Sequence, residues 1–334
     1  MNAALDLNQS AQPDVQAAEA FAAAHTGAVV VARTVEGRVR AVGRDRLDLL
    51  HRMSTNELLN LPVGEARPTV LTSPIARIVD QLWVLNRGET VLCLTGPGRA
   101  TAVRRWLAGY IFYNDKVKFE DASAELCQLG LFGKSAAAVA EALQAGAAAL
   151  AENHFLDDGA LLVWRGRPLA GDGYTVIAPA ARQEALWQQA LAAGAVPASE
   201  DVFQMLRLAA GQPANPELTE DYIPLEANLW AAVNFHKGCY IGQEIIARME
   251  SRGKLARRLV GLQLAALVPP GTDVRATADG PVVGAVTSAR SVPGLGPVAL
   301  AYLKTTAAEP GTHVLAGDVA ATVSELPFTA SQRE

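Results

Sequence analysis

Apolar and polar residues alternate along much of the chain, or the apolar ones form short runs, and both patterns are typical of β-strands. Such segments lie at residues 28–32, 39–42, 70–72, 78–85 and 90–94. The turn Asn86-Arg87-Gly88 separates the last two segments, and turns of this composition favour a β-hairpin. The pattern therefore predicts a β-rich first part of the chain with a hairpin over residues 78–94.

Helical spacing interrupts these strands. Asp45 is a candidate N-cap for a helix whose apolar positions Leu47, Leu50, Met53 and Leu58 recur at near-helical intervals before Pro62 stops it. A second helix is predicted over residues 99–110. Further along, strands are predicted at 116–119, 127–132, 161–164 and 174–177, and helices at 135–144 and 181–193.

The C-terminal part has a different character. Glycine and proline punctuate apolar runs at residues 259–264, 282–286, 298–303 and 319–323, which predicts a small all-β domain. Strands and helices mix upstream without strict alternation, so the fold class is α+β. The 334 residues exceed the roughly 250 to 300 that one hydrophobic core supports, which predicts two or three domains. Residues 1–15 are polar and are expected to be a loose tail.

The net charge and the absence of targeting signals argue against several classes of protein. The 29 Lys and Arg residues against 34 Asp and Glu give a net charge of −5, which argues against a dedicated DNA-binding protein. No 18-residue window is apolar enough to predict a membrane span. The first 32 residues contain no Lys or Arg, so neither a signal peptide nor a transit peptide is expected, and the predicted location is the cytoplasm.

The chain's cysteines and histidines do not form a metal-binding pattern. Cys93, Cys127 and Cys239 lie far apart, are odd in number and lack the paired spacings of zinc or disulfide frameworks, which fits a reducing compartment. The five histidines form no His-x-x-x-His pair, so no metal site is predicted. The stretch 130–135 is similar to a phosphate-binding loop, but Gln128 stands where that loop needs glycine.

The most informative segment is the stretch 235–244 around Cys239. Gly238 and Gly242 free the backbone on both sides of the thiol, and a helix is predicted to start at Gly242 with Glu244 in its first turn. A helix N-terminus and the nearby cation of Lys237 both lower the pKa of a thiol, which makes Cys239 a candidate catalytic thiolate. Its alternative role is that of a small buried hydrophobe in a glycine-rich turn, the role expected for Cys93 and Cys127.

This segment carries a family resemblance. Lys237-Gly238-Cys239-Tyr240-x-Gly242-Gln243-Glu244 resembles the signature of the YgfZ family, folate-binding relatives of the glycine-cleavage T-protein implicated in the maturation of iron-sulfur proteins. The resemblance extends over about residues 27–325. It includes Gly43-x-Asp45, Ser54-Thr55-Asn56, the stretches 206–213 and 223–229, and Gly284-Ala285-Val286-Thr287-Ser288.

Two departures from the T-protein bear on activity. That enzyme carries an Asp-Asp pair on a strand, and the similar stretch here has Asp80 followed by Gln81. The glutamate with which the T-protein binds the pterin falls on Ala209. Because a missing general acid or base typically costs about 10² to 10⁴ in rate, aminomethyl transfer is disfavoured.

The resemblance implies a T-protein-like architecture of three domains. Residues 1–26 would be a loose N-terminal segment, and residues 27–45 with 123–250 a split folate-binding α+β domain. Residues 46–122 would form an inserted α+β domain, and residues 255–330 a C-terminal β-barrel.

The function implied by the resemblance is a tetrahydrofolate-binding accessory protein in iron-sulfur protein assembly or repair, acting through Cys239 rather than by its own turnover. The expected partners are folate and iron-sulfur proteins, including tRNA-modifying ones, or their assembly factors. The alternative is a folate-dependent aminomethyltransferase or other one-carbon transferase. The expected folate-binding residues are Asp80, Arg207, Glu226 and Asn228, and Glu217, Glu220 and Asp221 stay open as replacements for the missing carboxylates.

The stretch 248–258 holds five cations and one carboxylate, Glu250. A solvated linker between domains is one interpretation, because charge runs usually face water. The other is a contact with the glutamate tail of folate or with an RNA phosphate.

Overall fold

The computed structural model describes residues 15–253 and 255–328. The chain divides into two compact units. Of the described residues, one unit combines those up to Ala22 with Ala198–Gln212 and those from Leu259 to Phe328. The other contains Ala23–Pro197 and Pro213–Arg258.

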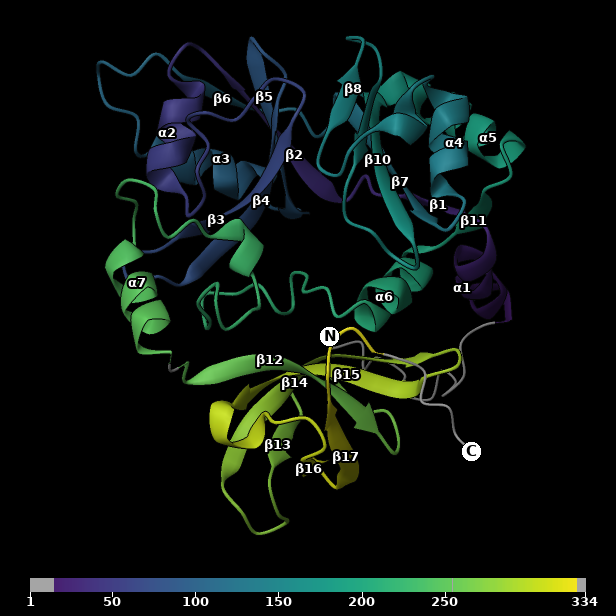
Figure 1. Cartoon of the computed structure of the whole chain (residues 1–334), viewed down its shortest axis with the longest axis vertical. Helices are drawn as coiled ribbons and strands as arrows, with labels where there is room; N and C mark the ends of the chain where they lie inside the picture. Colours follow the sequence, from purple (N-terminus) through teal and green to yellow (C-terminus); the bar gives the residue numbers. More distant parts are fainter. Residues whose placement is uncertain (1–14, 254, 329–334) are drawn as a thin grey trace, which may run out of the picture. The chain divides into compact units, whose positions relative to one another are not determined.

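A five-stranded antiparallel sheet forms the first layer of the larger unit (Figure 1). Its order is β3-β4-β5-β2-β6, and the predicted hairpin is confirmed because β4 and β5 pair with Asn86 opposite Val91. The helices α2 (Arg46–Met53) and α3 (Ala100–Ala108) bury Leu50, Val103 and Leu107 against this sheet. The strands are β2 (Glu36–Val42), β3 (Ala66–Thr72), β4 (Ile78–Asn86), β5 (Thr90–Pro97) and β6 (Lys118–Asp121).

A second sheet of the same unit has six strands in the order β11-β1-β7-β10-β9-β8. The helices α4 (Ala136–Leu143) and α5 (Gln183–Ala192) lie together on one face of it (Figure 1), and Val139 and Leu186 join its core there. Its strands are β1 (Val29–Ala32), β7 (Leu126–Gly133), β8 (Phe155–Asp157), β9 (Leu162–Arg165), β10 (Asp172–Pro179) and β11 (Val196–Ala198).

The two sheets pack against each other through the faces that the helices leave open. Leu85, Leu92 and Leu94 of the first sheet share one apolar cluster with Leu162 and Ile177 of the second. The rings of Trp83 and Trp164 meet at 4.6 Å between centroids. The larger unit is therefore a helix–sheet–sheet–helix sandwich in which both faces of each sheet are covered, and this explains why so many of its strands are continuous apolar runs.

The smaller unit contains a closed β-barrel in the order β12-β15-β14-β13-β16-β17, which confirms the all-β C-terminal domain. Helix α6 (Glu200–Ala209) belongs to the same unit and is capped by Ser199, whose hydroxyl accepts from the Val202 N–H. The strands are β12 (Arg257–Leu264), β13 (Asp273–Arg275), β14 (Val282–Val292), β15 (Gly296–Lys304), β16 (His313–Ala316) and β17 (Val319–Ser324).

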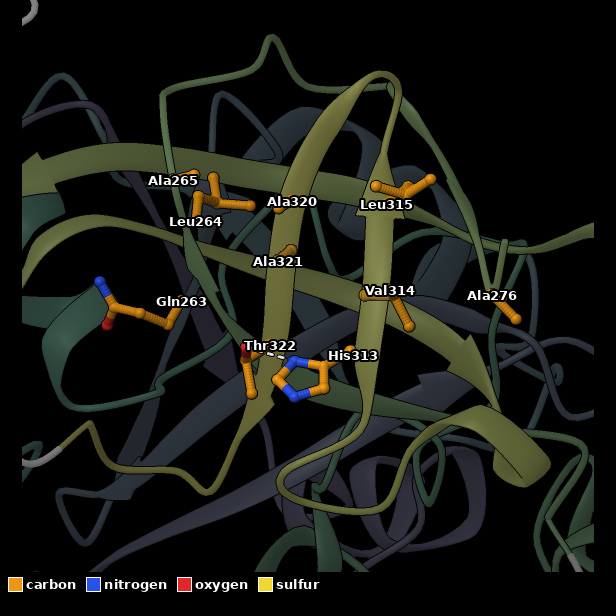
Figure 2. A pocket seen from close by; sticks show the side chains of 10 residues that line it. All are labelled: Gln263, Leu264, Ala265, Ala276, His313, Val314, Leu315, Ala320, Ala321 and Thr322. Carbon is orange, nitrogen blue, oxygen red and sulfur yellow. Dashed lines mark hydrogen bonds between the residues drawn. The ribbon is translucent and has the colours of Figure 1, made fainter. Parts of the chain in front are cut away.

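A shallow cavity of about 510 Å³ lies on the barrel, over the β16–β17 hairpin (Figure 2). His313 and Thr322 lie side by side at one end of it, with His313 Nδ1 3.2 Å from Thr322 Oγ1. Most of the other lining residues are small or apolar, among them Ala265, Leu315 and Ala320.

Two of the predicted segments have a different conformation in the structure. Residues 15–26 of the segment expected to be loose form helix α1 (Val15–Thr26), because its alanine-rich sequence favours a helix and buries Phe21 and Ala24, whereas residues 1–14 lie outside the described residues. Helix α2 ends at Met53, well before Leu58, because Ser54 turns into an extended conformation and forms a β-bridge with Leu71.

The expected domain boundary at residue 46 falls after β2. That strand pairs with both β5 and β6, so the five-stranded sheet begins at Glu36. The three-domain boundaries themselves stay predictions, whereas the α+β class with a closed C-terminal barrel is confirmed. Within the described ranges, no helix is long and apolar enough to cross a membrane.

Candidate functional site

The thiol-bearing segment lies between a short 3₁₀ turn, η3 (Trp230–Ala232), and helix α7 (Gln243–Arg252). It is anchored by a small apolar cluster in which Tyr240 and Ile246 are buried against Ala76, Leu225 and Val233. Ala76 lies in the turn between β3 and β4, so the cluster fixes the segment to the end of the five-stranded sheet. Burial raises the pKa of the Tyr240 phenol to about 12, which keeps it neutral.

Gly242 sets the start of helix α7, as predicted. Its φ of +82° is a left-handed conformation that glycine adopts without strain, and an added Cβ would lie 2.8 Å from both the Ser73 carbonyl oxygen and the Ala76 Cα. Gln243 then begins the helix, and Glu244 lies in its first turn. Only a glycine allows both this turn and this close approach, so Gly242 determines how the chain passes from Cys239 into the helix.

Lys237 is buried and bonds to the chain segment that follows helix α2. The residue is 9% exposed, and its ammonium donates hydrogen bonds to the carbonyl oxygens of His51, Ser54 (2.6 Å) and Asn56 (3.0 Å). The ammonium also lies 5.1 Å from the centre of the Tyr240 ring. Burial lowers the pKa of Lys237 to about 8, while the charge of Glu57 opposes that change. The three N–H donors are thus engaged by the chain that leaves helix α2, which gives Lys237 a structural role, and its predicted effect on the thiol stays a prediction.

The triplet Ser54-Thr55-Asn56 is the other half of this arrangement. Thr55 Oγ1 donates to the Ala232 carbonyl oxygen at 2.6 Å and accepts from the Val70 N–H, and the Asn234 N–H donates to the Thr55 carbonyl oxygen at 2.9 Å. Asn56 Nδ2 donates to the carbonyl oxygens of Pro68 and Ala231. The sequence resemblance pointed to this triplet without giving it a role, and the structure shows that it ties strand β3 to the thiol-bearing segment.

His51, on the last turn of helix α2, was not predicted as a site residue. Its Nδ1 lies 3.2 Å from the Leu58 N–H, which donates to it, and 3.4 Å from Glu57 Oε1. Burial and the charge of Lys237 lower the pKa of His51, against the smaller opposing effects of Glu57 and Asp48. The imidazole is therefore neutral at pH 7.

Cys239 is exposed, whereas Cys93 and Cys127 are buried. Burial raises the pKa of Cys93 to about 12 and also raises that of Cys127. The two buried thiols therefore have the structural role expected from the sequence, and Cys239 is the thiol that solvent reaches. No group of three potential metal ligands comes together among the described residues.

Asp80, on strand β4, is the buried carboxylate of the expected folate site. It is 3% exposed, and its Oδ1 accepts a long hydrogen bond of 3.4 Å from the Gly96 N–H. Arg99 Nε lies 3.5 Å from Oδ2, which gives Oδ2 a charge partner but no hydrogen-bond donor. Burial raises the pKa of Asp80 to about 6, while Arg99 and the Gly96 N–H oppose that change. A buried carboxylate oxygen without a donor is one that a ligand N–H can satisfy.

Gln81 faces the opposite side of the sheet. In the pairing of β3 with β4, Asp80 lies opposite Leu71 and Gln81 opposite Val70, so their side chains alternate between the two faces. Of the two carboxylates in the Asp-Asp pair of the T-protein, this chain therefore retains only the one at Asp80.

Glu226 and Asn228 are in the same unit as Asp80. Glu226 is buried, its Oε2 accepts from the Ile223 N–H at 3.1 Å, and Arg77 Nη1 lies 3.9 Å from the same oxygen. Asn228 is exposed and has a positive φ of 60°, an uncommon conformation that asparagine tolerates better than most residues. Among the open alternatives, Glu217 is fully buried and accepts from the Ala214 N–H.

Arg207 belongs to the other unit, on helix α6. Its guanidinium donates to the Gln204 side chain, to the Gln212 carbonyl oxygen and to Ser288 Oγ on strand β14. These contacts hold helix α6 against the barrel. Its predicted folate contact stays a prediction beside this structural role.

Comparisons with known proteins agree with this architecture. The family described as GCVT N-terminal domain matches residues 8–237, and the glycine cleavage T-protein C-terminal barrel domain matches residues 257–329. The crystal structure of the glycine cleavage system aminomethyltransferase T from Bartonella henselae superposes with a TM-score of 0.85 over 94% of this chain and 90% of that chain, at 22% identity.

Two curated relatives are similar over most of the sequence. The "Putative transferase At1g60990, chloroplastic" of Arabidopsis thaliana is 33% identical over 324 residues, which cover 94% of this chain and 74% of the relative. The aminomethyltransferase of Geobacillus kaustophilus is 31% identical over 292 residues, which cover 83% of this chain and 79% of the relative. With the two domain matches, these similarities show that the chain belongs to the glycine-cleavage T-protein family.

Proposed function

We propose that this protein is a tetrahydrofolate-binding accessory protein for the assembly or repair of iron-sulfur proteins, of the YgfZ type, that acts through Cys239. The observation that carries the proposal is the exposed thiol on a turn that buried contacts hold on both sides. A thiol held in this way can engage a partner's sulfur or metal without losing its position. Iron-sulfur proteins, including tRNA-modifying ones, or their assembly factors are the proposed partners, and the cytoplasm is the proposed location.

Folate is the proposed ligand because the residues present suit a pterin. Asp80 offers a buried carboxylate oxygen that lacks a donor, and pterin rings carry several N–H groups. On binding, the N–H groups of the pterin ring would exchange their hydrogen bonds to water for hydrogen bonds to the Asp80 carboxylate. The positive charge of Arg99 would keep this carboxylate ionised. Glu226 and Asn228 are the further proposed contacts in the same unit.

A folate-dependent aminomethyltransferase is the second candidate. The curated relative from Geobacillus kaustophilus carries that name, and a carboxyl with a pKa of about 6 can exchange a proton near neutral pH. Gln81 and Ala209 count against this activity, because neither can supply the carboxylate expected there. For this reason we place accessory function first.

The deciding experiment is genetic. In a host deleted for the gene, the activities of iron-sulfur enzymes, including tRNA methylthiolation, should fall. The wild-type chain should restore them and the Cys239→Ala variant should not. Unchanged activities in the deletion host would overturn the proposal.

A biochemical assay tests the second candidate. The purified protein is incubated with tetrahydrofolate and the aminomethyl-loaded carrier protein of the glycine cleavage system. Tetrahydrofolate should bind with little methylene-tetrahydrofolate produced. Rapid turnover would instead establish the transferase.

A further inference from the structure

Neither the backbone conformation nor the surrounding space requires a glycine at position 238. Its φ lies outside the left-handed region, and a Cβ added there would meet no atom closer than 4.0 Å. The atom at that distance is His51 Nε2. A side chain at position 238 would therefore fit, in van der Waals contact with His51 Nε2.

The proton of His51 lies on that free edge. A neutral imidazole carries one proton, and Nδ1 acts as an acceptor because the Leu58 N–H donates to it. The proton is thus on Nε2, the atom that faces Gly238. The charged groups that act on the ring are Lys237, Glu57 and Asp48, and they belong to the thiol-bearing segment, the loop after α2 and helix α2.

Two contacts bring the His51 ring close to the residues that precede Cys239. The His51 carbonyl oxygen accepts from the Lys237 ammonium, two residues before Cys239. Gly238, which lies over Nε2, is bonded directly to Cys239, and neighbouring Cα atoms are about 3.8 Å apart. The imidazole edge therefore lies beside the residue that presents the thiol.

We propose that His51 is a second functional residue of the Cys239 site, whose Nε2–H donates a hydrogen bond to negative charge held at Cys239. That charge is the thiolate itself or an anionic group of a ligand bound beside it. Gly238 keeps the donor uncovered. This inference deepens the proposed function and rests on it for its biological meaning, but its chemistry can be tested without a client protein.

The test uses two alkylating probes on the purified chain. Iodoacetamide is neutral and iodoacetate carries a negative charge, and both label Cys239 by displacing iodide. In His51→Ala, the labelling rate at pH 7 should fall about five- to tenfold, because a neutral donor to a charged group is lost. The fall should be larger for iodoacetate, because its carboxylate also loses the donor.

Three further variants separate this role from a structural one. Gly238→Ala should also lower the rate, but less than His51→Ala, because its methyl group would lie 4.0 Å from Nε2 and would only partly restrict the approach to it. His51→Gln, which retains an N–H donor, should recover part of the rate. His154→Ala changes an exposed histidine that lies just before strand β8 and forms an isolated β-bridge with Glu65, and this variant should label like the wild type. Urea unfolding of each variant shows whether a lower labelling rate comes from misfolding.

Equal rates and equal probe preference in folded His51→Ala, Gly238→Ala and the wild type would overturn the inference. The genetic test of the proposed function reads iron-sulfur enzyme activity instead. The labelling test can therefore fail while the genetic test succeeds, and the reverse is equally possible.

Discussion

The ammonium of Lys237 and the carbonyl oxygen of Ser54 meet at 2.6 Å in the protein interior, across more than 180 residues of sequence. Ser54 is the first residue after helix α2, and Lys237 begins the thiol-bearing turn. The same ammonium satisfies two neighbouring carbonyl groups. This one contact therefore joins the end of a helix in the first part of the chain to the turn that carries Cys239.

Removal of the Lys237 charge should destabilise the larger unit. Lys237→Met keeps much of the aliphatic length but leaves three carbonyl oxygens without their donor. Each unsatisfied buried acceptor costs about 1–3 kcal/mol, and partial access of water reduces the sum, so we expect the free energy of unfolding to fall by about 2–4 kcal/mol. Urea unfolding followed by circular dichroism measures this loss.

Lys118→Met is the matched control for this variant. Lys118 lies on strand β6 with a side chain that is 73% exposed, and its removal should change the free energy of unfolding by less than about 0.5 kcal/mol. If Lys237→Met were as stable as Lys118→Met, the three carbonyl contacts would have no energetic role.

Gly242→Ala should be the more damaging of two glycine substitutions. Gly98 and Gly242 both have positive φ, +68° and +82°, but an added Cβ at Gly98 would meet nothing within 4 Å. Gly98→Ala should therefore cost only the left-handed strain of about 1–2 kcal/mol. Gly242→Ala adds the overlap with Ser73 and Ala76 and should cost at least about 1 kcal/mol more. Equal losses in thermal unfolding would show that the turn relaxes around the new methyl group.

Asp80→Asn should stabilise the protein at pH 7 and weaken folate binding. The pKa of Asp80 rises from 3.8 to about 6 on folding, so the folded state binds more protons between these pH values. The contribution of this group to stability is full below pH 3.8 and is lost as the pH rises through about 6. At 1.36 kcal/mol per pH unit, the charged form at pH 7 costs about 3 kcal/mol, which asparagine avoids.

Two measurements test the Asp80 prediction. The unfolding free energy of Asp80→Asn should exceed that of the wild type at pH 7 by about 1–3 kcal/mol and should equal it near pH 4. Titration calorimetry should then show weaker binding of tetrahydrofolate. A variant that is less stable at pH 7 would mean that the Arg99 contact outweighs the cost of burial.

Much of the fold could be predicted from the sequence, because period-two alternation and glycine-rich turns mark strands whatever their partners. The β4–β5 hairpin, helix α3 and the barrel strands β12, β14, β15 and β17 follow from these local signals, whereas the short barrel strands β13 and β16 were not predicted. Helix α2 shows the limit. Its apolar spacing continues to Leu58, but the side chains of Thr55 and Asn56 bond to distant backbone groups, and these tertiary contacts end the helix at Met53.

The site could be predicted only in part for the same reason. The glycines around Cys239 and the start of helix α7 are local features, and they were correctly identified. The role of Lys237 depends on carbonyl groups at His51, Ser54 and Asn56, far away in the sequence. No spacing rule could connect them, and a lysine near a cysteine therefore suggested a charge effect on the thiol.

Cys239 should react far faster than the other two thiols. Cys239 is exposed to solvent. Cys93 and Cys127 are buried, and burial raises the pKa values of their thiols. Iodoacetamide at pH 7 should therefore label Cys239 within minutes and the buried pair only after unfolding. Mass spectrometry of tryptic peptides locates the label. Cys239→Ala should leave stability within about 0.5 kcal/mol, because an exposed side chain fills no core volume. Early labelling of Cys93 would instead show that the first sheet opens in the native state.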